Sequence, residues 1–365
     1  MVSNPSSNLR EFVVFLRSNR SGAKLVRGGT WSLLLKLLHA ALALLVAVLL
    51  ARLLGPAQYG IYSFVFALVT LLAIPVQMGL PVLVVRETAA GRAREDWSLV
   101  DGIWRWALRV AGVGSGGVIA TAGILMLTIW EELSPAMRWT SLAALPLIPL
   151  IALGALHGAA LRGRDRIVLG QLPDYVLRLA LLAILVPAWW AWSTQLSAPV
   201  AMLLHLAAAA LALGISHLLV RVSGYRRRTA VESRHPRAWL ASILPLGFIA
   251  AAQVVNTRAD TLLLGILTNP ESVGIYQVAV QGAMVVALGL GAINLVVAPR
   301  FAFLYSKGKK RELQRLVTLS ARVIVLFTLP VVIALVFAGS FAIRLVFGQE
   351  YQSSHLPLVI LAAGQ

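Results

Sequence analysis

The chain has 365 residues, of which 59% are hydrophobic and only 13% are charged, whereas about 25% of the residues of a soluble domain are charged. It contains no cysteine, which excludes disulfides and thiolate metal sites. Several charge-poor runs are long enough to cross a hydrocarbon layer about 30 Å thick. The composition therefore predicts an integral membrane protein, although a net charge of +18 would indicate a nucleic-acid partner in a soluble one.

The hydropathy pattern predicts a basic first segment and then nine membrane spans with the start of a tenth. Residues 9–16 of the first segment could form a short amphipathic helix on the membrane surface. The spans are expected at about 29–54, 60–80, 110–130, 141–161, 169–192, 198–220, 239–267, 274–298, 316–338 and from 356 onward. Between the second and third spans, an Arg- and Trp-rich stretch is interpreted as a separate interfacial helix.

The basic residues alternate between the two sides of these spans. With the N-terminus in the cytoplasm, 25 of the 32 Lys and Arg residues lie in cytoplasmic segments, three lie in outer segments or at the outer ends of spans, and four lie within spans. Such a bias sets the orientation of membrane proteins, so the prediction is a multi-pass protein of the inner (plasma) membrane with a cytoplasmic N-terminus. The bias also explains the net charge without nucleic acid.

One stretch of the chain occurs twice. Pro56, Gly60 and Tyr62 recur as Pro270, Gly274 and Tyr276, and each pair is 214 residues apart. The offset crosses six spans, an even number, which predicts parallel repeats about an axis normal to the membrane. The expected fold is an all-α polytopic membrane protein of two pseudo-symmetric helical bundles.

The repeat also predicts the division of the chain. The expected parts are a cytoplasmic segment (1–28), a six-helix bundle (29–222), a cytoplasmic basic linker (223–238) and a second bundle (239–365). Since the second bundle would contain only three spans and part of a fourth, we expect it to be truncated by roughly two and a half helices of ~20 residues each.

A series of short motifs resembles those of oligosaccharide flippases, the Wzx-type polysaccharide transporters of the multidrug/oligosaccharidyl-lipid/polysaccharide exporter superfamily. These motifs are LLGPAQYGIY (53–62), MGLP (78–81), VRE (85–87), LRG (161–163), LGQLP (169–173), RADTLLLG (258–265), VGIY (273–276) and GQEY (348–351). Their order and spacing carry the resemblance, which covers the chain from about Leu25 to its end.

The resemblance implies two six-helix bundles around a central cavity. Alternating access of this cavity would move a lipid-linked sugar across the membrane. Members of the family have twelve to fourteen spans, so the expected truncation leaves open whether this chain transports at all.

Charged side chains within spans are costly and usually face a bundle interior or a wet cavity. In the seventh span, Gln253, Asn256 and Asp260 share one helical face, and Arg258 points away from it. These residues are candidates for a polar cavity wall, with Arg258 or a neighbour meeting a pyrophosphate and Asp260 meeting sugar hydroxyls or a coupling cation. The alternative is interhelical hydrogen bonding or snorkelling near the membrane surface.

Further candidates lie in other spans. In the first span, Lys36 is a candidate for an anion contact from the inner side, and His39 could titrate in a coupling step; snorkelling and packing are the alternatives. Asp174 and Arg178, four residues apart, are secondary candidates that could instead neutralise each other. The repeat-related pair formed by Arg86 and Arg300 could guide anionic headgroups or simply anchor span ends.

No catalytic motif or metal-binding cluster is legible, so an enzyme is not expected. Three functions remain open: a flippase for a diphosphate-linked oligosaccharide, a cation-coupled drug or metabolite antiporter, and a non-transporting scaffold in a polysaccharide assembly complex. The expected partners are membrane lipid and the lipid-linked oligosaccharide, with a polysaccharide polymerase or glycosyltransferases in the assembly. No cofactor is expected apart from H⁺ or Na⁺ as a coupling ion.

Overall fold

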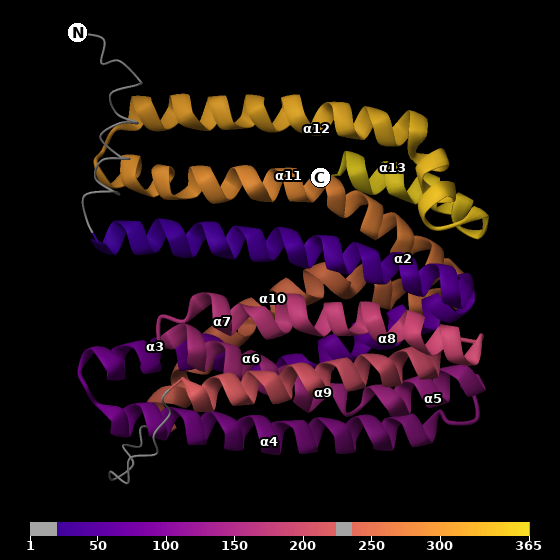
Figure 1. Ribbon diagram of the computed structural model, residues 1–365, viewed down its shortest axis with the longest axis horizontal. Helices are drawn as coiled ribbons and strands as arrows, with labels where there is room; N and C mark the ends of the chain where they lie inside the picture. The colour runs from indigo at the N-terminus through magenta and orange to yellow at the C-terminus, as the bar shows by residue number, and fades with distance from the viewer. Residues whose placement is uncertain (1–19, 224–235, 365) are drawn as a thin grey trace.

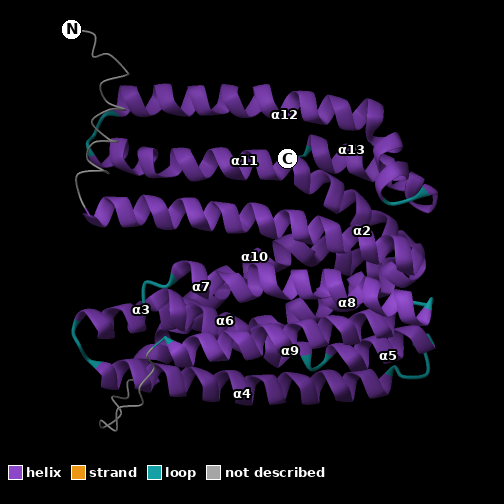
Figure 2. Cartoon of the chain, viewed as in Figure 1, coloured by secondary structure: helices purple, strands orange, loops and turns teal. Residues whose placement is uncertain are grey.

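The computed structural model describes residues 20–223 and 236–364, and every element within these ranges is a helix (Figures 1 and 2). The first bundle consists of α2 (Arg20–Gln77), α3 (Leu80–Ala93), α4 (Trp97–Thr128), α5 (Pro135–Ala144), α6 (Leu147–Gly163), α7 (Ile167–Leu172), the π-helix η1 (Pro173–Leu177), α8 (Arg178–Ser193) and α9 (Ala198–Val222). The second part consists of α10 (Pro236–Leu267), α11 (Pro270–Ser306), α12 (Lys310–Val346), the 3₁₀-helix η2 (Gln349–Ser354) and α13 (His355–Ala363).

Seven of the described helical segments are long and apolar enough to span a membrane. One of them, residues 34–77, is 44 residues long, about twice the length that one crossing requires. The predicted all-α polytopic fold is confirmed, and the protein is a multi-pass membrane protein. The predicted surface helix at residues 9–16 lies outside the described residues.

Helix α2 is a hairpin of two arms, residues 20–54 and 56–77, which meet at Gly55. Gly55 has φ 72° and ψ 169°, a conformation that is accessible to glycine because it has no Cβ. Pro56 follows, and a residue before proline is pushed out of the helical region. The Gly-Pro pair therefore reverses the chain between the first two predicted spans.

In the second copy of the hairpin, the residue before the proline is Asn269 rather than a glycine. Asn269 caps α11 in an extended conformation (φ −89°, ψ 161°) and its side chain accepts a hydrogen bond from Ser272 N at 2.9 Å. Pro270 then occupies the first turn, where its missing N–H costs nothing. The repeat thus preserves the proline turn, while the residue before it changes.

The two copies of the hairpin lie against each other, and α2 and α11 form the most extensive contact between helices. The end of α12 and η2 also contact both copies. Tyr351 of η2 donates a hydrogen bond to Ala51 O at 2.9 Å, and Ser354 donates to Ile275 O at 2.8 Å. Arg52 donates to Val346 O at 2.6 Å. The end of α12 and η2 therefore fastens the turn of α2 to the start of α11.

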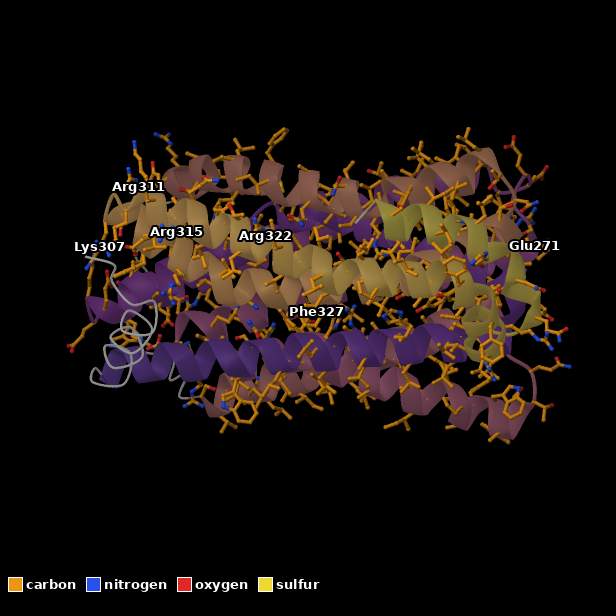
Figure 3. All side chains as sticks on the ribbon, turned by 90° about the horizontal axis from the view of Figure 1, so that it is seen from above. Glu271, Lys307, Arg311, Arg315, Arg322 and Phe327 are labelled. Carbon is orange, nitrogen blue, oxygen red and sulfur yellow. The ribbon has the colours of Figure 1, made fainter. Side chains whose placement is uncertain are left out.

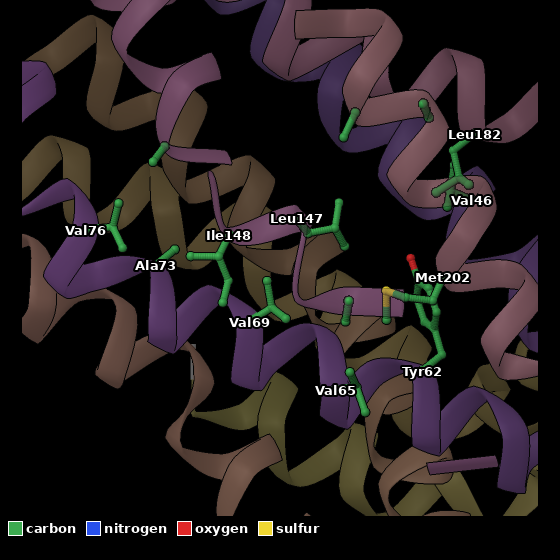
Figure 4. Close-up of a cluster of buried hydrophobic side chains, with 14 of the residues drawn as sticks. Val46, Tyr62, Val65, Val69, Ala73, Val76, Leu147, Ile148, Leu182 and Met202 are labelled. Atoms are coloured by element: carbon green, nitrogen blue, oxygen red, sulfur yellow. The ribbon is translucent and has the colours of Figure 1, made fainter. Parts of the chain in front are cut away.

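The core of the first bundle includes the second arm of α2 and the start of α6 (Figure 4). Val65, Val69, Ala73 and Val76 recur along one face of the arm and are almost fully buried. They pack near Leu147 and Ile148. Within a bilayer, lipid tails are as apolar as these side chains, so close packing rather than release from water holds the helices together.

The stretch expected to be one interfacial helix between the second and third spans is divided in the structure: Arg86 and Arg92 lie on the separate helix α3, whereas its Trp-rich part does not form an element of its own. Residues 97–109 are instead the first three turns of α4, which begins at its cap Asp96 and runs on without a break for 32 residues. Trp104 is buried, and Trp106 packs against Trp239 of α10 with 5.3 Å between ring centroids. Trp104 and Trp106 therefore serve packing between helices, a use that composition cannot distinguish from membrane-surface anchoring.

Basic side chains gather at one end of the molecule. Lys307, Arg311 and Arg315 lie at the end where α11 meets α12, whereas Glu271 lies at the opposite end (Figure 3). This distribution agrees with the alternation of charge along the sequence.

Candidate functional site

A cavity of about 260 Å³ lies between the two hairpin copies and the first bundle. Its polar lining comes from five helices. The polar lining residues are His39, Tyr59, Tyr62, Ser63 and Thr70 of α2, Arg178 of α8, His205 of α9, Arg258 of α10, and Gln277 and Gln281 of α11. We call this space the central cavity.

The central cavity has a cationic lining. Arg178 and Arg258 both line it, and the described lining includes no Asp or Glu. Arg178 Nε is buried and has no hydrogen-bond partner among the described residues. A buried N–H donor without an acceptor is costly, so Arg178 Nε is suited to an acceptor that enters the cavity.

His205 provides a second buried nitrogen that has no hydrogen-bond partner among the described residues. Its Nδ1 lies 2.7 Å from Tyr62 Oη, whereas its Nε2 is buried without a hydrogen-bond partner among the described residues. Phe66 packs on the same imidazole at 4.8 Å between centroids. The imidazole is thus held on one side by α2, and its other nitrogen remains available to an acceptor in the cavity.

Arg258 reaches the central cavity from α10. Its guanidinium carbon lies 5.6 Å from the centroid of the Phe66 ring, a distance at which the ring face attracts a cation. The sequence pattern predicted that Arg258 points away from Gln253 and Asn256, and in the structure those two side chains are exposed while Arg258 lines the cavity. Gln253 and Asn256 are therefore not brought to the cavity wall.

Asp260 holds α10 to α11. Its carboxylate accepts a hydrogen bond from Tyr276 Oη at 2.7 Å and another from Thr261 N at 2.7 Å. It is not among the residues that line the central cavity. The structure thus gives Asp260 the interhelical hydrogen bond that the sequence left open as its alternative role.

Of the two candidates on the first arm of α2, one lines the central cavity and the other does not. His39 lines the central cavity and its Nδ1 lies 2.9 Å from Tyr175 O of η1. Lys36 is exposed and is not part of the cavity lining. The two positions are three residues apart in the helix, so a small rotation of α2 about its axis decides which one faces inward.

The remaining candidates have structural surroundings. Asp174 and Arg178 line a smaller cavity together, yet the described ion pairs include none between them. Arg86 donates to Glu87 at 3.0 Å and to Ser242 of α10 at 3.2 Å, so it bridges α3 and α10. Arg300 is half-buried near the end of α11.

Tyr59, Tyr62 and the glutamines of α11 line the cavity, although none of them was predicted as a site residue. One signal for the glutamines was available: Gln277 and Gln281 lie four residues apart in an apolar run and therefore share a helical face. His205 packs against Phe66 and Tyr62, and it also lines the cavity.

Comparison with known proteins places these features in context. A family model described as polysaccharide biosynthesis protein matches residues 25–304. The capsular polysaccharide biosynthesis protein CapF of Staphylococcus aureus is 27% identical over 121 residues, which are 33% of this chain and 31% of CapF. The match therefore spans about a third of that relative's length.

Solved structures of similar fold are also known. A multidrug resistance MATE family transporter of the MOP superfamily in its inward-facing conformation has a TM-score of 0.67 at 15% identity, covering 89% of this chain and 76% of that one. An outward-facing conformation has a TM-score of 0.60 at 16% identity, covering 96% and 82%. At such identities the likeness concerns the fold alone.

Proposed function

Because the chain belongs to the polysaccharide biosynthesis protein family, we propose that it moves a lipid-linked oligosaccharide across the membrane by alternating access of its central cavity. The diphosphate that joins the lipid to the sugar would occupy the cavity, while the lipid tail stays in the bilayer. The membrane would be the inner (plasma) membrane, with the N-terminus in the cytoplasm, as the charge bias indicates.

The observation that carries this proposal is the pair of arginines in the cavity lining. Arg178 and Arg258 project from helices of different halves, α8 and α10, into one cavity whose described lining includes no carboxylate. Guanidinium groups recognise phosphate oxygens through paired hydrogen bonds. A group that carries negative charge on several oxygens could engage both arginines, and could also accept a hydrogen bond from His205 Nε2.

The same lining argues against a cation-coupled antiporter for drugs or metabolites. Such a cavity would be expected to hold acidic residues for Na⁺ or H⁺. The two acidic candidates, Asp174 and Asp260, are not among the lining residues of the central cavity, and Asp260 is hydrogen-bonded to Tyr276.

The experiment is reconstitution of the full chain into vesicles that carry a lipid-diphosphate-linked sugar on one leaflet. Appearance of the sugar on the other leaflet is followed with an enzyme that cannot cross the membrane. We expect protein-dependent flipping of this lipid and no acceleration for a matched lipid-linked sugar without the diphosphate. A chain that flips neither lipid, but co-isolates with a polymerase or with glycosyltransferases, would contradict transport and identify a scaffold.

A further inference from the structure

A second hollow lies on the first bundle and shares no lining residue with the central cavity. It has a volume of about 1000 Å³, at the upper end of small-molecule sites. Helices α4 and α9 form its sides and α6 forms its floor. We call it the α4–α9 groove.

The groove is amphipathic along its length. Most of its lining is apolar and includes leucines of α4, α6 and α9. The polar groups are His157 on α6 and His217 and Arg221 on α9, where α9 approaches its C-terminal end. The acidic residues of the neighbouring elements, Asp101 and Asp174, are not among the lining residues. One end of an apolar groove is therefore basic.

The two histidines form a hydrogen-bonded pair with a defined direction. His157 Nδ1 lies 2.8 Å from Leu153 O, and because a carbonyl only accepts, this nitrogen carries the proton. In a neutral His157, Nε2 then accepts from His217 Nδ1, which lies 3.2 Å away. His217 is exposed, and the described hydrogen bonds leave its Nε2 without a partner.

Trp104 stabilises this arrangement from α4. Its ring meets the His157 imidazole edge to face, with 5.0 Å between centroids at 88°. His157 is thus fixed by its own helix and by α4, and it fixes His217 in turn. Only His217 and Arg221, among the described lining residues, remain to meet a ligand at the basic end of the groove.

From this geometry we propose that the α4–α9 groove binds an anionic membrane phospholipid. Its acyl chains lie along the leucine walls, and its phosphate meets Arg221 and His217. The charge of Arg221 is complementary to an anionic headgroup, and basic pockets between membrane helices are suited to such headgroups. The site is independent of the transported substrate and would persist if the central cavity had another function.

The apolar half of the groove is tested by filling it. Gly214 lines the groove, and a Cβ built on it meets nothing within 4 Å, so Gly214→Phe fits without a clash at its Cβ. Gly117 of α4 is a matched control position for Gly214, since a Cβ built on it also meets nothing within 4 Å. Gly117 lies on the face of α4 opposite to Leu108, which lines the groove, because nine residues of a helix leave a rotation of half a turn. Gly117→Phe is therefore the control.

The basic half is tested by removing charge. Arg221→Gln removes the cation of the groove, and Arg315→Gln removes an exposed cation of α12 outside it. The full-length protein in detergent is titrated with phosphatidylglycerol or phosphatidylcholine, and retained lipid is counted by native mass spectrometry. Size-exclusion profiles and thermal unfolding establish that each variant is folded.

We expect the unaltered protein to retain phosphatidylglycerol at least about fivefold better than phosphatidylcholine. Gly214→Phe and Arg221→Gln should each abolish that preference, whereas Gly117→Phe and Arg315→Gln should keep it. Equal retention of the two lipids by the unaltered protein would overturn the proposal, as would Gly214→Phe and Arg221→Gln variants that behave like their controls. If Gly214→Phe fails to fold, the Arg221 pair decides alone.

Discussion

Gly60 and Gly274, the repeat partners 214 residues apart, each lie against the proline turn of the other copy. A Cβ built on Gly60 would lie 1.7 Å from Pro270 O, and one built on Gly274 would lie 2.1 Å from Pro56 O. The contact is therefore reciprocal, as expected where two repeats meet at their pseudo-symmetry axis. Only the absence of a side chain at both positions lets the two turns approach so closely.

We predict that Gly60→Ala and Gly274→Ala each destabilise the protein, because a backbone carbonyl cannot move aside as a flexible side chain can. The expected cost in the free energy of unfolding is about 1–3 kcal/mol, the range for overpacking. Thermal unfolding in detergent measures it. Gly112→Ala, whose Cβ would meet nothing within 4 Å, is the control, and an equal loss in all three variants would show that the contact is not responsible.

The hydrogen bond between Asp260 and Tyr276 is predicted to couple α10 to α11. In a double-mutant cycle of Asp260→Ala and Tyr276→Phe, we expect a coupling free energy of about 0.6–1.7 kcal/mol, the range found between membrane helices. Asp260→Ala combined with Tyr351→Phe should instead be additive, because these residues share no described hydrogen bond. A coupling near zero for Asp260 and Tyr276 would remove the structural role and reopen a role in cation binding.

Tyr351 predicts a dependence of stability on alkaline pH. Burial raises the pKa of its phenol, and nearby Tyr59 and Glu350 raise it further. The phenol must keep its proton to donate to Ala51 O. A raised pKa in the folded state means that the stabilisation is complete below the unfolded pKa of about 10 and is lost as the pH rises above it.

The measurement is thermal stability between about pH 7 and pH 11 for the unaltered protein and for Tyr351→Phe. At neutral pH the variant should lose about 1 kcal/mol with its hydrogen bond. Above about pH 10 the unaltered protein should lose stability more steeply than the variant. Parallel pH profiles would mean that Tyr351 does not contribute to the alkaline loss.

The orientation is tested with compartment reporters fused after Glu131 and after Arg228. Three predicted spans precede Glu131 and six precede Arg228, so the reporters should lie in opposite compartments. The charge bias places the Arg228 fusion in the cytoplasm. Reporters that both lie on one side would contradict the parallel repeat and, with it, the central cavity between its two copies.

The sequence predicted the elements of this fold better than the directions of its side chains. Pro56 and Pro270 predicted two hairpins correctly, because a proline turn between two apolar runs has few alternatives. By contrast, the side of α2 that faces inward depends on packing against other helices. Residue spacing alone could not determine that His39 faces the cavity and that the exposed Lys36 does not.

Two local features also prevented the sequence from predicting which side chains face the cavity. The π-helix η1, Pro173–Leu177, changes the number of residues per turn just before Arg178, so an ideal helix places the side chains of α8 on the wrong face. Tyr59 and Tyr62 lie in an apolar run where an aromatic side chain packs as well as it lines a cavity. Their role becomes visible only when His205 of α9 is placed beside Tyr62.

The central claim is that cavity arginines hold the diphosphate of a lipid-linked sugar during transport, and the flipping rate of cavity variants in reconstituted vesicles tests it most directly. We predict that Arg178→Gln and Arg258→Gln each slow flipping by about 10- to 150-fold, since a hydrogen bond to a charged group contributes about 1.5–3 kcal/mol. Lys36→Gln, which removes an exposed charge outside the cavity, should leave the rate within about twofold. Flipping at the unaltered rate in a folded Arg178→Gln/Arg258→Gln double variant would contradict the claim.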